Sequence, residues 1–230
     1  VLANMAEIDL ACGRGVEARA KIERALVLTL KNPDVDIIAG KYYLAQGDRK
    51  RALECFAEAS SWSLEPSSTG LEAALVLIDA NCMEEALAIL HPILVENPSN
   101  PILNYYAGLA SLNSGRPGDA RKYLIKALNL DPSMPMPLVE LGILAAGEGN
   151  MKEAESLFRK ALVLVPEYPE ARYNLGMLLK STSRPEEALD EFIMCGKLRP
   201  DNQMILGQIE ECRRIISGKA GSDEPDRKGN

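Results

Sequence analysis

Apolar residues recur three and four positions apart along most of this chain, which is the spacing of amphipathic helices rather than the alternation of strands. Residues 101–134 show the pattern clearly. The apolar positions that fall three and four apart within each half of this segment are Leu103, Tyr106, Ala107, Ala110, then Ala120, Leu124, Ala127 and Leu128. The segment Ser114-Gly115-Arg116-Pro117 interrupts the pattern, and Pro117 stands where a new helix can begin. The pattern therefore predicts two helices joined by a turn.

The same pattern returns at a constant stride of 34 residues, six times without an insertion. One column is alanine throughout: Ala18, Ala52, Ala86, Ala120, Ala154 and Ala188. Another is large and apolar: Ile22, Phe56, Leu90, Leu124, Phe158 and Phe192. A third is Gly or Ala: Ala6, Gly40, Ala74, Gly108, Gly142 and Gly176. We infer that the small residues let two helix backbones approach closely and that the large residue fills the space above their contact.

Two further columns predict where the helices end. Turn-forming residues precede each second helix: Gly13, Gly47, Asn81, Gly115, Gly149 and Ser183. Proline closes the last four units, at Pro98, Pro132, Pro166 and Pro200, whereas the first two units have Leu30 and Leu64 there. Because proline disfavours helix at the residue before it, the second helix of these units should end just before it.

The stride, the Leu175-Gly176 pair, Ala188, Phe192 and Pro200 resemble the tetratricopeptide repeat, a helix-turn-helix unit of 34 residues. The resemblance implies an all-α, right-handed superhelical solenoid of six such repeats plus a C-terminal capping helix. The expected repeats are 1–32 (incomplete), 33–66, 67–100, 101–134, 135–168 and 169–200. In place of the aromatic residue that the family has early in the first helix, this chain has Leu2, Asp36, Gly70, Asn104, Leu138 and Arg172. We expect looser packing at those junctions and an intact fold.

The two ends depart from the repeat. Because the first unit is incomplete, we expect the native chain to continue upstream of Val1. Residues 201–217 should form the capping helix, with one apolar stripe of Ile205, Ile209, Cys212 and Ile216. Residues 218–230 have no apolar period and are expected to be a disordered tail.

Composition excludes several functions. The formal net charge of −7 argues against binding to a phosphate backbone. The apolar run 73–78 is too short to span a bilayer. No phosphate-binding loop, metal motif or catalytic constellation is present, so we expect no enzyme activity, no cofactor and no metal, and we read the lone His91 as structural or merely exposed. The five cysteines are unclustered, which favours free thiols and a reducing cytoplasm; a disulfide between Cys195 and Cys212 is the alternative.

The resemblance places function in a concave groove lined by the first helices. The side chains expected to face this groove and bind a peptide are Lys41, Leu71, Glu72, Leu75, Tyr105, Tyr106, Leu109, Val139, Glu140, Ile143, Tyr173, Asn174, Met177 and Lys180, with Ile37 and Asn113 beside them. The column Leu75, Leu109, Ile143 and Met177 is apolar throughout, and an exposed stripe of that kind needs a covering partner. The competing interpretation is that several of these side chains pack between repeats, Tyr106 above all.

Two groove chemistries known in this family do not fit the residues present. The carboxylate clamp of chaperone-binding domains would fall on Tyr105 or Leu109, on Glu140, and on Glu170 or Asn174, and Glu140 would repel a carboxylate. An asparagine ladder of the sugar-transferring kind is matched only at Asn4 and Asn174. An apolar groove with acidic Glu72 and Glu140 instead favours a partner segment with apolar anchors and one or two Lys or Arg.

The leading hypothesis is therefore a non-catalytic scaffold that binds a peptide or an amphipathic helix of another protein. Two alternatives stay open: self-assembly into a homo-oligomer, and a substrate-recruiting arm of a larger enzyme. No nucleic-acid partner is expected.

Overall fold

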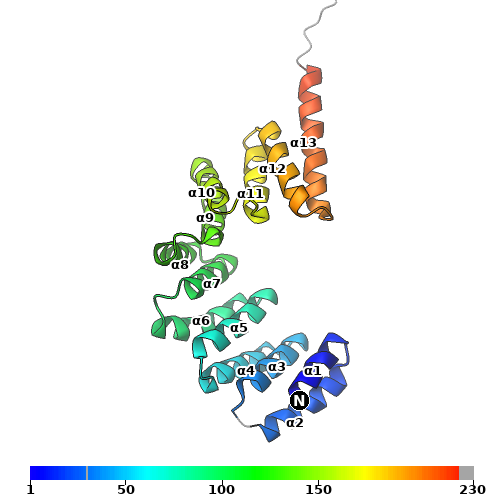
Figure 1. Cartoon of the computed structure of the whole chain (residues 1–230), viewed down its shortest axis with the longest axis vertical. Helices are drawn as coiled ribbons and strands as arrows, with labels where there is room; N and C mark the ends of the chain where they lie inside the picture. The colour runs from blue at the N-terminus through cyan, green and yellow to red at the C-terminus, as the bar shows by residue number, and fades with distance from the viewer. Residues whose placement is uncertain (30, 223–230) are drawn as a thin grey trace, which may run out of the picture. The chain divides into compact units, whose positions relative to one another are not determined.

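The computed structural model describes residues 1–29 and 31–222, and every regular element in these ranges is an α-helix, as predicted (Figure 1). The helices are α1 (Leu2–Ala11), α2 (Gly15–Leu28), α3 (Pro33–Ala45), α4 (Arg49–Trp62), α5 (Pro66–Asp79), α6 (Met83–Glu96), α7 (Pro101–Asn113), α8 (Pro117–Leu130), α9 (Pro135–Gly147), α10 (Met151–Leu164), α11 (Pro169–Ser181), α12 (Pro185–Leu198) and α13 (Gln203–Ser222).

Consecutive helices pack as pairs, so each repeat is one helix-turn-helix unit. The chain divides into two compact units, which we describe separately. Residues Val1–Leu130 hold the pairs α1/α2, α3/α4, α5/α6 and α7/α8, each packed on the next. The second unit begins at Asp131 and holds α9/α10, α11/α12 and the single helix α13 against α12. The predicted helix-turn-helix repeats and the additional C-terminal helix are confirmed.

The turns inside the repeats form as predicted from their residue types. Gly13, Gly47, Gly115 and Gly149 all have positive φ, between 73° and 83°. This left-handed conformation costs glycine nothing because glycine has no Cβ. Asn81 and Ser183 have φ of 58° and 62° in the two remaining repeats, and asparagine tolerates this region better than most residues. The column that predicted turns therefore marks the residue whose backbone reverses the chain.

The second helices also end where the prolines predict. Helices α6, α8, α10 and α12 end at Glu96, Leu130, Leu164 and Leu198, each just before its proline. Helices α2 and α4 end at the equivalent positions without a proline, so a proline there is not required to end the helix.

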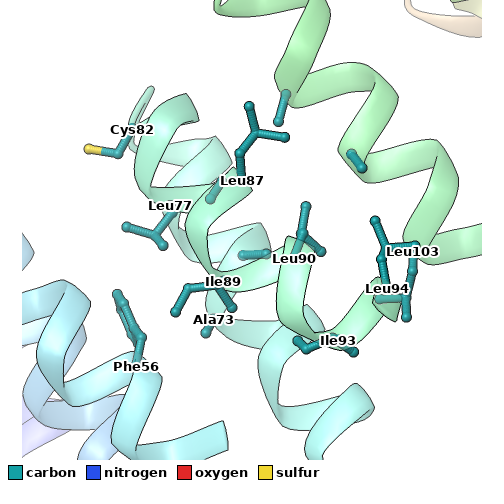
Figure 2. Close-up of a cluster of buried hydrophobic side chains, with 14 of the residues drawn as sticks. Phe56, Ala73, Leu77, Cys82, Leu87, Ile89, Leu90, Ile93, Leu94 and Leu103 are labelled. Atoms are coloured by element: carbon teal, nitrogen blue, oxygen red, sulfur yellow. The ribbon is translucent and has the colours of Figure 1, made fainter. Parts of the chain in front are cut away.

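Close approach of the paired helices depends on the small residues in the first helix. A Cβ added at Gly40 would lie 2.4 Å from Cε1 of Phe56, and one added at Gly142 would lie 2.5 Å from Cε1 of Phe158. Neither position therefore accommodates a side chain while the ring keeps its place. In the first unit these contacts join into a continuous apolar cluster from α3 to α7. Figure 2 shows Phe56, Leu77, Leu90 and Leu103 in this cluster.

Polar residues and a glycine replace the family's aromatic residue without leaving the junctions open. Asn104 is fully buried, and its Nδ2 donates hydrogen bonds to the main-chain oxygens of Pro98 (3.1 Å) and Asn100 (2.7 Å). At Gly70, Ile93 fills the space instead, because its Cδ1 lies 2.0 Å from where a Cβ would stand. The loose packing expected at these two junctions is not observed.

Asp36, at the same repeat position, is 5% exposed. Burial, with a smaller contribution from the negative charge of Glu58, raises the pKa of its carboxyl to about 6.

Helix α13 closes the C-terminal end of the second unit as an amphipathic cap. Ile205 and Cys212 are buried against the repeats, whereas Arg213 and Arg214 are exposed. The helix continues to Ser222, beyond the expected end at Ser217 and into the segment expected to be disordered. A single glycine within a helix costs only about 1 kcal/mol, so Gly218 does not stop it. The rest of the expected tail, 223–230, lies outside the described residues.

All five cysteines are free thiols, including Cys195 and Cys212, the alternative disulfide pair. Cys82, Cys195 and Cys212 are buried, and burial raises the pKa of each thiol. These three side chains therefore act as small core residues.

Candidate functional site

In the first unit, the predicted groove residues include a network of ion pairs that links three first helices. The Lys41 ammonium lies 3.1 Å from the Glu7 carboxylate on α1 and 3.6 Å from the Glu72 carboxylate on α5. Lys41 and Glu72 therefore neutralise each other in part, while the Glu72 side chain stays 57% exposed. The sequence pattern could not show this because the three residues come from different repeats.

Most of the predicted apolar groove residues of the first unit take part in packing. Leu71 and Tyr106 pack against the apolar cluster, and Tyr105 is 8% exposed. The Tyr105 and Tyr106 rings lie 4.9 Å apart at a tilt of 60°. The structure thus favours the packing interpretation of Tyr106. Leu75 and Leu109 are half-buried and offer only part of their surface.

In the second unit, three predicted residues meet around a real hollow. Ile143 on α9 and Asn174 and Met177 on α11 line a space of ≈ 280 Å³. The other lining residues are Ala146, Met151, Phe158, Leu178 and Ser181, from α9, α10 and α11. Ile143 is 37% exposed, whereas Phe158 is buried. The hollow therefore has a mainly apolar lining and one amide side chain.

Glu140 stands one helical turn before Ile143 on the same face of α9. It is half-buried, and burial raises the pKa of its carboxyl to about 7. No ion pair to Glu140 is present among the residues that the structure describes. A half-buried carboxylate of this kind gains most from a cation that reaches it and replaces its lost hydration.

The remaining predicted residues of the second unit are engaged with their neighbours. Val139 is 2% exposed, and the Tyr173 ring packs edge-on against Phe192, with 5.8 Å between centroids. Lys180 on α11 donates to the Glu211 carboxylate on α13 at 2.8 Å. These contacts join α11 to α12 and α11 to α13, and Tyr173 and Lys180 each keep part of their surface exposed. The Nδ2 group of Asn174 uses one of its two N–H donors on the Glu170 main-chain oxygen (2.8 Å), which leaves the other N–H and the Oδ1 acceptor for a ligand.

Sequence reasoning missed the part of the hollow that comes from the second helix. Met151 begins α10, and Phe158 was assigned to the core alone. The only signal was that Phe158 stands opposite Gly142, which places its ring directly beneath α9.

The hollow combines an apolar lining with a half-buried carboxylate one helical turn away on α9. The described part of the chain contains no group of three or more His, Cys, Asp or Glu that could hold a metal ion. Among those residues, no helix combines the length and the apolar character needed to cross a bilayer.

Solved structures with the same fold share little sequence with this chain. Yeast Tom70 is 19% identical with a TM-score of 0.72, over 97% of this chain and 48% of Tom70. PilW, a type IV pilus biogenesis factor, is 20% identical with a TM-score of 0.62, over 91% of this chain and 96% of PilW. YrrB, described as a TPR protein with an unusual peptide-binding site, is 22% identical with a TM-score of 0.53, over 81% of this chain and 96% of YrrB.

A search of curated proteins finds no match. The sequence model of the tetratricopeptide repeat, generally a module for protein–protein interaction, matches residues 71–135 and 139–193. Those two segments cover about half of the chain and include the helices that form the hollow. This chain therefore belongs to the tetratricopeptide repeat family.

Proposed function

We propose that this protein is a non-catalytic scaffold that binds a short segment of a partner protein, with an apolar anchor side chain and a nearby Lys or Arg. The observation that carries the proposal is the hollow between α9 and α11, with the half-buried Glu140 one turn away on α9. An apolar anchor side chain of the partner removes the Ile143 and Met177 side chains from water. The cation of the partner pairs with the Glu140 carboxylate and replaces its lost hydration.

Donor and acceptor chemistry supports the same class of partner. The Asn174 Oδ1 and, one turn away, the Glu140 carboxylate are acceptors, whereas one of the two Asn174 N–H donors is already used within α11. A partner with an acidic terminus would meet Glu140 and be repelled. Hydrophobic anchors with flanking cations are the form of ligand that these groups favour.

The test immobilises the full chain and selects the peptides that bind it from a displayed library of random 12-residue peptides. We expect the selected peptides to be enriched in large apolar residues with a neighbouring Lys or Arg. Ile143→Asp should reduce their affinity about tenfold or more, since it places a charge in an apolar contact. The matched control is Val163→Asp, which changes an equally apolar, 81% exposed residue on α10. Enrichment of acidic peptides, or equal binding to Ile143→Asp and wild type, would contradict the proposal.

A second candidate, self-association, is favoured by exposed apolar side chains on α1. On this helix of the first repeat, the side chain of Met5 is 44% exposed and that of Ile8 is 59% exposed. A second copy of the chain could cover them. Sedimentation velocity over a hundredfold concentration range tests this, with Ile8→Glu as the variant that should restore a monomer. Concentration-independent sedimentation of the wild type would exclude it.

A further inference from the structure

A second hollow lies in the first unit, on the side of the second helices rather than the first. It measures ≈ 310 Å³ and lies between α4 and α6 at the start of α5. The lining residues are Ala57, Ser60, Ser61, Pro66, Ala88, Ile89, Pro92, Ile93 and Glu96. It shares no residue with the hollow on α9 and α11 and is independent of the function proposed there.

Proline inside α6 supplies an unusual acceptor at this hollow. Pro92 has no N–H, so the helical hydrogen bond to the main-chain oxygen of Ala88 is missing. Ala88, Pro92 and Glu96 are spaced four apart, which places them in one row along the helix. All three line the hollow, and the Ala88 carbonyl, which points along this row toward Pro92, has no helical N–H partner.

The facing helix α4 adds two more acceptors. Ser60 donates its hydroxyl proton to the Phe56 main-chain oxygen (3.1 Å), and Ser61 donates to that of Ala57 (2.9 Å). Each hydroxyl oxygen then has only lone pairs to offer. With the Glu96 carboxylate, the described lining presents acceptors on both sides and no cationic side chain.

The walls between these acceptors are apolar. Ile89 and Ile93 are buried, and Pro92 exposes its ring beside them. Figure 2 shows Ile89 and Ile93 on α6 among the side chains of the apolar cluster. Ile93 packs tightly against the backbone of α5 because Gly70 has no Cβ, so this part of the wall is firmly held.

We propose that this hollow binds an arginine side chain of a partner protein. A guanidinium group is planar and carries five N–H donors that point in several directions, which matches acceptors on two facing helices. Its weakly hydrated faces pack on apolar groups such as Ile89 and Pro92. A lysine ammonium is compact and strongly hydrated and would satisfy fewer of the acceptors at once.

The test uses N-acetyl-arginine amide as the probe and amide chemical shifts of the full, ¹⁵N-labelled chain as the readout. We expect saturable shifts confined to residues 57–61 and 88–96, with a dissociation constant in the millimolar range, as befits one side chain. N-acetyl-citrulline amide, which has the same shape without the charge, should bind at least about threefold more weakly. N-acetyl-lysine amide should also bind more weakly.

Two variants separate the acceptors from the shape of the hollow. Pro92→Ala restores an N–H to the Ala88 oxygen and removes no helix stability, so it should fold and weaken binding about threefold or more. Glu96→Gln should weaken it about threefold, since this carboxylate is exposed. Pro117→Ala and Glu186→Gln are the matched controls, at an N-terminal proline of α8 and an exposed glutamate of α12.

The two control variants, Pro117→Ala and Glu186→Gln, should bind N-acetyl-arginine amide with the affinity of the wild type. Absence of saturable shifts, equal binding of the citrulline or the lysine probe, or unchanged affinity in both Pro92→Ala and Glu96→Gln would overturn the assignment.

Discussion

The substitution Gly142→Ala tests the packing rule on which each repeat depends. A methyl group at this position would lie 2.5, 2.8 and 3.0 Å from Cε1, Cδ1 and Cζ of the Phe158 ring. Ordinary contacts begin at 3.4 Å, so the ring or the helix must move by about 1 Å. Overpacking of a filled core costs about 1–3 kcal/mol, whereas replacing a helical glycine by alanine returns about 1 kcal/mol. The net loss should be about 1 kcal/mol, and up to about 2.

A second glycine of the same helix provides the control. Gly147 also lies in α9, but a Cβ there would meet nothing within 4 Å. Gly147→Ala should therefore raise the free energy of unfolding, by up to about 1 kcal/mol. Gly147 is the last residue of α9 and gains less helix propensity than the interior Gly142. The difference between the two variants therefore gives a lower bound on the cost of the clash with Phe158. Urea unfolding followed by circular dichroism measures both.

Reducing the ring should rescue the first variant. The third repeat already pairs Ala74 with Leu90, in the positions that Gly142 and Phe158 occupy in the fifth. In the Gly142→Ala background, Phe158→Leu should therefore cost less than it costs by itself, with a coupling energy of about 1 kcal/mol or more. If Gly142→Ala is as stable as Gly147→Ala and shows no coupling to Phe158→Leu, the close approach of α9 to α10 does not limit the size of residue 142.

Three further predictions follow from burial and charge. Asp36→Asn should raise the free energy of unfolding by about 2 kcal/mol at pH 7.5 and have little effect at pH 4. The folded carboxyl, with its pKa of about 6, binds its proton more tightly than the unfolded one. In urea titrations the wild type should therefore lose stability relative to the variant as pH rises from 4 to 6. Parallel pH profiles for variant and wild type would contradict this. Binding of a cationic peptide should weaken as pH falls from 8 to 6, because the Glu140 carboxylate, with a pKa of about 7, takes up a proton. Calorimetry should show that Glu140→Gln removes this pH dependence. A pH dependence that survives the substitution would assign it to another group. Ala154→Leu, at a fully buried position, should cost about 1–3 kcal/mol by overpacking, a cost that thermal unfolding would measure and an unchanged melting temperature would disprove.

The sequence by itself determined the repeating unit. A stride of 34 residues, turn residues such as Gly47 and Asn81, and prolines such as Pro132 fix where helices begin, reverse and end. These features act over a few residues or between the two helices of one repeat, so a pattern along the chain is enough to predict them. The small-residue column was interpreted correctly for the same reason, since Gly142 and Phe158 belong to one helix pair.

Only the tertiary structure decided which side chains are available to a partner. Lys41 meets carboxylates from two other repeats, and Tyr105 and Val139 are buried although their helix face was expected to be open. The hollow beneath Ile143 needs Met151 and Phe158 from the next helix, and the second hollow brings Ala88 of α6 together with Ser60 and Ser61 of α4. Exposure, charge neutralisation and concavity depend on where several helices place their side chains, and no periodicity along one chain encodes that placement.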